Sequence, residues 1–196
     1  MPQEDSLLNK SGFAIVFLSI IMIGFFAMKW SRNVQKIQHL TLATAGKNGT
    51  YYNFALALAE VVNKHNPRLK ITVLETEGSR QNAEWLQEKK VDLALLQSDT
   101  PVDSKIKAVS FLFPEMFHLV VNRRSGINSV SELKGKRIAI MPRKSGSYAL
   151  FWPLSQHYGL KKPDFAAFPL PFEAASQALI NGQVDAIFFI GALGGK

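Results

Sequence analysis

The chain has 196 residues, 47% hydrophobic and 19% charged, a composition that fits one globular domain or two small ones with one very apolar stretch. It has no cysteine, which excludes a disulfide framework, a thiolate metal site and a lipoprotein anchor. The formal net charge is +8, but the basic residues occur singly or in short pairs such as Lys89-Lys90. We interpret them as a solvated basic surface, with an acidic ligand or an anionic lipid surface as the alternative, and expect no nucleic-acid partner because no binding signature accompanies them.

An uncharged run, Gly12 to Met28, precedes the first predicted strand. Its 17 residues reach the low end of the length that crosses a bilayer, and Lys29, Trp30 and Arg32 follow it as interface residues often do. We expect residues 12–30 to contact the membrane as an uncleaved signal anchor, within an N-terminal tail, anchor and linker that span residues 1–36. A cleaved signal peptide, which would release the rest of the chain, is the alternative, but the run is long for one and no typical cleavage site follows.

The soluble part contains an internal repeat. Lys47 to Tyr51 recurs as Lys144 to Tyr148, and Val91 to Leu96 recurs as Val184 to Phe189. Similar spacing of the two pairs indicates one structural unit used twice. Each unit is expected to run strand, glycine-rich turn, helix, strand, helix, strand.

Hydrophobic periodicity places the elements of each unit in chain order. The first unit is predicted to contain a strand over 37–43, a turn over 45–50, a helix over 51–65, a strand over 70–74, a helix over 80–89 and a strand over 91–97. The second is predicted to contain a strand over 137–140, helices over 148–158 and 172–181, and a strand over 184–190. This alternation predicts an α/β fold with two parallel-sheet lobes, the first over residues 37–106 and the second, with the crossover, over residues 107–196.

The repeated turns are the candidate ligand site. In an open parallel sheet, ligands bind beyond the carboxyl ends of the strands, where both turns are expected. Glycine lets the backbone approach a ligand, and the free N–H groups at a helix start favour an anionic group. Lys47 and Lys144 lie beside the turns and would add charge. One such turn would be an ordinary helix cap, but two in equivalent positions favour a site built from both lobes.

Several segments resemble the TAXI-type solute-binding subunits of tripartite TRAP transporters. The resemblance runs in order from Leu40 to Ile190, and its most specific parts are the Thr-Tyr-Tyr turn ending at Tyr52, Gly78 to Asn82, and the Gln-Ser-Asp segment ending at Asp99. It implies a type II periplasmic-binding fold, a location on the periplasmic face of the bacterial inner membrane, and delivery of an organic anion or amino acid to a TRAP-type permease. The charge count conflicts with this location, because Lys10 precedes the anchor and three basic residues follow it, which places the C-terminal side in the cytoplasm.

The resemblance also implies which residues bind the solute, carried over position by position. These are Gly49, Thr50, Tyr51, Gly78, Ser79, Gln97, Ser98, Glu115, Ser145, Gly146 and Ser147. The sequence departs from the family at Met141, where a glycine is common, and at Lys47 in a turn that is normally glycine-rich. Family members also continue beyond Ile190, so we expect the second lobe to be incomplete.

Other functions are weighed against solute binding. An enzyme is not expected, because no nucleophile elbow, metal-binding histidine pair or convergent acid and base is present. Neither a cofactor nor a metal is expected. A membrane-anchored ligand sensor that acts through a partner protein, and a truncated remnant that no longer binds, are the two alternatives to a transport receptor.

Overall fold

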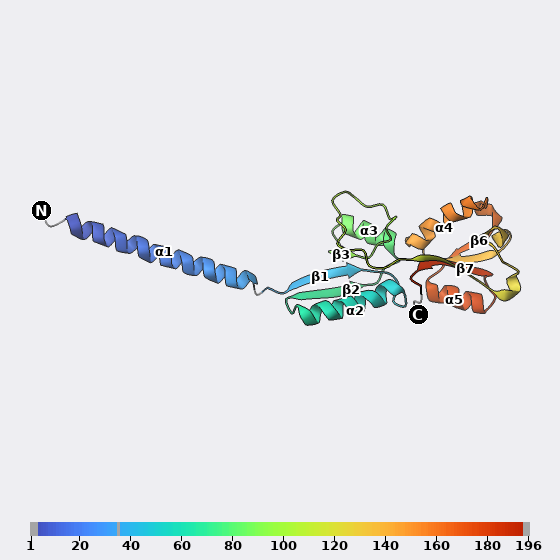
Figure 1. The fold of residues 1–196 in the computed structure, drawn as a ribbon, viewed down its shortest axis with the longest axis horizontal. Coiled ribbons are helices and arrows are strands. Elements are labelled where there is room, and N and C mark those ends of the chain that lie inside the picture. Colours follow the sequence, from blue (N-terminus) through green and yellow to red (C-terminus); the bar gives the residue numbers. More distant parts are fainter. Residues whose placement is uncertain (1–3, 35, 194–196) are drawn as a thin grey trace. The chain divides into compact units, whose positions relative to one another are not determined.

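The computed structural model describes residues 4–34 and 36–193, in two compact units, Met1–Gln38 and His39–Lys196 (Figure 1). Helix α1 (Glu4–Val34) makes up most of the first unit. Its segment Gly12–Trp30 has a mean hydropathy of 2.2 and no buried residue. By length and composition this segment is able to cross a membrane, as a signal sequence near an N-terminus also is.

The first α/β half follows the predicted order closely. It contains β1 (Gln38–Ala43), α2 (Thr50–His65), β2 (Leu69–Leu74), α3 (Ser79–Gln87) and β3 (Leu93–Ala94). The strands form a sheet in the order β2-β1-β3, with β1 and β3 parallel. The main difference from the prediction is β3, which is two residues long where a strand over 91–97 was expected.

The second half contains β4 (Met116–Val121), β5 (Arg137–Ile140), α4 (Gly146–His157), β6 (Ala166–Pro169), α5 (Phe172–Ile180) and β7 (Ala186–Gly191). Short 3-10 helices occupy Arg123–Ser125, Val130–Leu133 and Lys162–Asp164. The sheet order is β4-β7-β5-β6, and β5 pairs in parallel with both β6 and β7, as predicted.

The bounds of two strands in this sheet were not predicted. β4 pairs antiparallel with β7 along its whole length, so the second sheet is mixed rather than wholly parallel. The β4 residues were expected to belong to the crossover between the lobes. In the structure they form an edge strand where the chain enters the second half. β6 has only four residues and ends at Pro169, too short to show a period of its own.

The structure confirms the internal repeat. β1-α2-β2-α3-β3 and β5-α4-β6-α5-β7 have the same element order, and each unit's first strand lies between its other two. The repeated Val-Asp motif has one role in both units. The Asp92 carboxylate accepts the Thr41 backbone N–H at 2.8 Å, and the Asp185 carboxylate accepts the Arg137 backbone N–H at 2.8 Å. Each aspartate therefore holds the start of its unit's last strand to the first strand.

The two halves are stabilised differently. In the second half, β5 is buried on both faces, with Ile138 and Ile140 packed beneath α4 against Phe151, and Ala139 packed against α5. The first half has a smaller apolar cluster. There the fully buried Asn82 side chain donates to the carbonyl oxygens of Thr44 (2.6 Å) and Leu95 (2.8 Å). This polar clasp ties α3 to the ends of β1 and β3.

Candidate functional site

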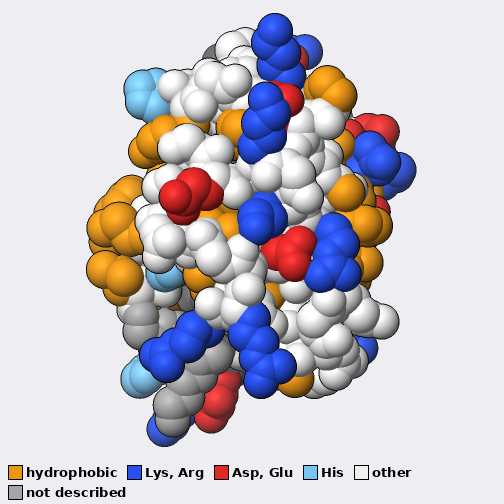
Figure 2. Space-filling model, turned by 90° about the vertical axis from the view of Figure 1, so that its right-hand side faces the viewer, with side chains coloured by type: hydrophobic (Ala, Val, Ile, Leu, Met, Phe, Trp, Pro, Cys, Tyr) orange, Lys and Arg blue, Asp and Glu red, His pale blue; other side chains and the backbone are white. Residues whose placement is uncertain are grey.

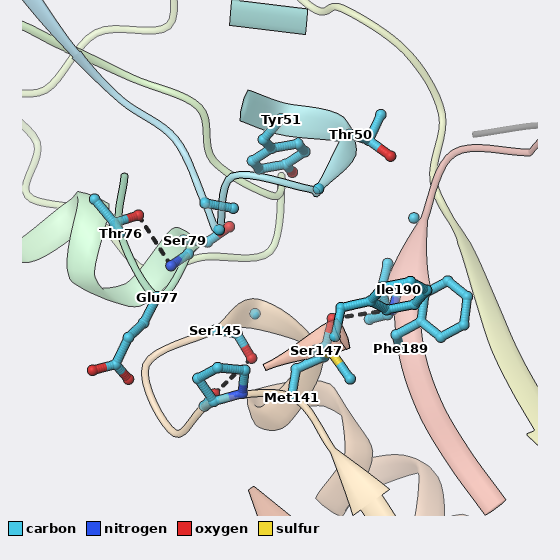
Figure 3. A pocket seen from close by; sticks show the side chains of 18 of the residues that line it. Thr50, Tyr51, Thr76, Glu77, Ser79, Met141, Ser145, Ser147, Phe189 and Ile190 are labelled. Carbon is cyan, nitrogen blue, oxygen red and sulfur yellow. Dashed lines mark hydrogen bonds between the residues drawn. The ribbon is translucent and has the colours of Figure 1, made fainter. Parts of the chain in front are cut away.

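A cavity of about 850 Å³ lies where the two halves meet. This volume is typical of small-molecule sites. In Figure 3, Thr50 and Tyr51 lie on one side of the cavity, with Ser145, Ser147 and Met141 on the other. Of the eleven residues carried over from the family resemblance, ten line this cavity: Gly49, Thr50, Tyr51, Gly78, Ser79, Gln97, Glu115, Ser145, Gly146 and Ser147.

Ser98 does not line the cavity and is exposed. It was placed at a strand end, but β3 stops at Ala94, and residues 98–100 form a turn. The strand therefore does not hold the side chain at position 98 on the cavity side.

The first repeated turn leaves the start of α2 open. Gly49 is the residue before the helix, and no side chain among the described residues caps the first turn. The first N–H groups of a helix have no partner within the helix. Because Gly49, Thr50 and Tyr51 line the cavity, these donors stand at its wall.

The second repeated turn is already engaged. The Ser145 hydroxyl accepts the Tyr148 N–H at 3.1 Å and donates to the Pro142 carbonyl at 2.7 Å, so it is a helix cap. The Ser147 hydroxyl oxygen accepts the Ile190 N–H at 3.0 Å (Figure 3). The two turns share a position in the repeat, but the second has less free hydrogen-bonding capacity.

The turn before α3 holds the halves together. The backbone N–H groups of Arg80 and Gln81 donate to the Lys144 carbonyl, at 3.0 and 3.3 Å. The Lys144 ammonium pairs with Glu84 at 2.7 Å. Only Gly78 and Ser79 of this segment were predicted to bind the solute, and the N–H groups that follow them bind the opposite half.

Two glycines permit this close approach. Gly78 has φ of +123°, which side chains rarely allow, and a Cβ on it would lie 3.2 Å from the Ser145 Cα. A Cβ on Gly146 would overlap the Gln97 side-chain amide. The Gln97 Oε1 is buried and has no hydrogen-bond partner within residues 4–34 and 36–193.

The NMT1-like family matches residues 42–195, which make up most of the chain. The chain belongs to this family. Among solved structures, it is similar to the alkanesulfonate-binding protein SsuA from Xanthomonas axonopodis pv. citri bound to MOPS, at 25% identity and a TM-score of 0.58 over 78% of this chain and 54% of that one. This NMT1-like chain therefore spans about half the length of that relative.

Two further solved structures share the fold. The first is HinK, a LysR family transcriptional regulator from Pseudomonas aeruginosa, with 17% identity and a TM-score of 0.62 over 94% of this chain and 66% of that one. The second is the GluR0 ligand-binding core from Nostoc punctiforme in complex with L-glutamate, with 20% identity and a TM-score of 0.51 over 77% of this chain and 69% of that one. The NMT1-like chain thus has the α/β fold of type II binding proteins.

A tyrosine and a carboxylate meet in the cavity of this NMT1-like chain. The Tyr51 hydroxyl donates to Glu115 Oε2 at 2.8 Å. Burial raises the pKa of Tyr51 far above its ordinary value, and the neighbouring Glu115 charge raises it further. Tyr51 is therefore a neutral donor at any physiological pH. Phe113 packs edge-on against Tyr51 and Phe54, which fastens the connecting segment to α2.

The charge of the lining differs from the prediction. Lys47 is in the lining, but its ammonium lies 3.7 Å from the Glu75 carboxylate, and Lys144 pairs with Glu84. Each predicted cation therefore has a carboxylate partner that offsets part of its charge. Sequence reasoning missed three lining carboxylates, Glu75, Glu77 and Glu173. A usable signal existed for two of them, because Glu75 and Glu77 directly follow the predicted strand over 70–74.

Proposed function

We propose that this chain is an extracytoplasmic solute-binding receptor that captures a small carboxylate or amino-acid-like solute without catalysis. It delivers the solute to a TRAP-type secondary transporter from the periplasmic face of the inner membrane, anchored through residues 12–30. The observation that carries the proposal is the cavity of about 850 Å³ between two copies of one α/β unit.

Known proteins of this fold support it. The solved SsuA structure holds MOPS, and the GluR0 core holds L-glutamate. A small molecule bound between two lobes is sequestered from water when the lobes approach each other. In this chain, residues 95–115 connect β3 to β4 without a helix or strand, which suits them to act as the hinge. The bonds between α3 and Lys144 are contacts that opening would break.

Calorimetry tests solute capture. The full chain, purified in detergent, is titrated with a panel of dicarboxylates, amino acids and sulfonates, and saturable binding of at least one is expected. Thr50→Ala removes a hydroxyl from the cavity wall and should weaken that binding by about 1 kcal/mol, roughly fivefold. Thr72→Ala, at an exposed position of β2 outside the lining, is the matched control and should bind like the parent. If no compound in the panel binds, the proposal fails.

The membrane orientation needs a separate experiment. Alkaline phosphatase fused after Lys36 is active only if that point lies in the periplasm, which is the expected result. An inactive fusion, together with an active cytoplasmic reporter at the same point, would favour the orientation that the flanking basic residues predict.

A ligand sensor is the second candidate, favoured by the fold shared with the HinK regulator. In that case the anchored receptor would report occupancy to a partner protein. Cross-linking in native membranes separates the two, because a transport receptor should join permease subunits and a sensor should join a signalling protein.

A further inference from the structure

We propose that the cavity selects solutes that carry a protonated amine and discriminates against purely anionic ones. This inference rests on the proposed solute binding and narrows the chemical class of the solute. The net charge of +8 by itself would favour an anionic solute, which is the opposite preference. On the face in Figure 2, Lys and Arg side chains lie scattered among acidic and apolar ones, so the overall charge says little about the cavity.

The balance of charge at the cavity wall favours a cationic group on the solute. Four carboxylates line it, against a single lysine. Lys47 is committed to Glu75 at 3.7 Å. Over the part of the chain that the structure describes, no ion pair engages Glu77, Glu115 or Glu173, so the wall carries three carboxylates in excess. Partial enclosure strengthens this field on a bound solute, since the effective dielectric constant there is below that of water.

The unused hydrogen-bonding capacity of the wall carboxylates also favours an ammonium group. Each of these three carboxylates uses one oxygen: Glu115 accepts from Tyr51, Glu77 from the Lys144 N–H, and Glu173 from Asn48. Their other oxygens accept no hydrogen bond from the described residues. An ammonium group supplies three donors and no acceptor, which complements such a wall. A second carboxylate on the solute would supply acceptors alone and repel the wall.

Tyr51 lies between a helix start and a carboxylate at the cavity wall. It belongs to the uncapped first turn of α2, and its hydroxyl binds the half-buried Glu115. The wall therefore has an electropositive helix start beside a carboxylate, joined by one neutral side chain. A solute with a carboxylate or sulfonate close to an amine matches both poles, with its anion at α2 and its ammonium at Glu115.

Matched pairs of solutes test the inference directly. Calorimetry with the full chain compares aspartate with succinate, glutamate with glutarate, and taurine with ethanesulfonate, so that each pair differs by one ammonium group. We expect the amine-bearing member of at least one pair to bind about tenfold tighter or more, which corresponds to one charge-assisted contact. If succinate, glutarate and ethanesulfonate each bind as tightly as their amine partners, the inference is overturned and the proposed receptor stands. If nothing binds, both fall.

Variants then locate the selectivity. Glu115→Gln keeps the acceptor for Tyr51 but removes the charge, and it should reduce the preference for the amine about tenfold. Glu173→Gln, exposed at the rim, should reduce the preference less. Glu60→Gln changes the same charge at an exposed α2 position outside the lining and should leave the preference unchanged. An unchanged preference in both Glu115→Gln and Glu173→Gln would contradict the role of the wall carboxylates.

Discussion

Gly78 offers the sharpest test of how the two halves meet. It precedes α3 with φ of +123° and ψ of −158°, in a region that only glycine occupies readily. Its backbone also lies against the second repeated turn, so that an added Cβ would approach the Ser145 Cα to 3.2 Å and its Cβ to 3.3 Å. Gly78→Ala therefore perturbs both the local backbone and the contact between halves.

The cost of Gly78→Ala follows from these two effects. An alanine in this backbone region costs about 1–3 kcal/mol. The close contact adds about 1 kcal/mol, because a neighbouring backbone atom must move rather than a flexible side chain. A total of about 3 kcal/mol corresponds to a fall in Tm of roughly 6–12 °C for a domain of this size.

Gly126→Ala is the matched control, since Gly126 also has positive φ, of +70°, but a Cβ there would meet nothing within 4 Å. It should cost about 1 kcal/mol and lower Tm by roughly 2–4 °C. Both changes are measured by thermal unfolding of the full chain in detergent, followed by circular dichroism. Equal losses of Tm in the two variants would show that the packing of Gly78 on Ser145 contributes nothing, and would refute the arrangement of the halves described above.

Three further predictions concern stability. Phe151→Ala, at a side chain only 1% exposed, should cost about 3–5 kcal/mol in chemical denaturation, and a loss below 1 kcal/mol would contradict the packing beneath α4. Asn82→Ala leaves the Leu95 carbonyl without its side-chain donor, while the Thr44 carbonyl still accepts from the Thr76 hydroxyl. It should cost about 1–3 kcal/mol in the same assay, whereas a neutral result would argue against the clasp. Hydrogen bonds from Thr41 lower the pKa of Asp92, and those from Arg137 lower the pKa of Asp185. Depressed folded-state pKa values contribute stability that is fully present above about pH 5 and is lost as the pH falls below about 4, toward the depressed pKa values. A double Asp→Asn variant should show a shallower fall in Tm between pH 6 and pH 3, and an unchanged slope would contradict the assignment.

Local patterns were sufficient for most elements but not for the short ones. The helix starting at Thr50 and the strand ending at Ile140 lie within a residue of their predicted limits, because each has a clear apolar period or run. β6 has no such signal, and the apolar run of β4 did not by itself distinguish a strand from the crossover. Their strand conformation depends on hydrogen bonds from β7 and β5, which are distant in sequence.

By itself, the sequence determined the α/β alternation, the duplicated unit and the apolar N-terminal segment, and the family resemblance supplied ten of the 27 residues that line the cavity. Repetition, periodicity and the positions of turns are properties of the sequence, so they can be recognised without the tertiary structure. Only the tertiary structure decided what those residues do. It showed that Lys47 and Lys144 form ion pairs with glutamates and that the start of α3 binds the Lys144 carbonyl. It also showed that carboxylates outnumber lysines at the cavity wall. Charge pairing and burial depend on which segments, distant in sequence, lie together in the fold. The sign of the net charge at the cavity wall is therefore known only from the tertiary structure.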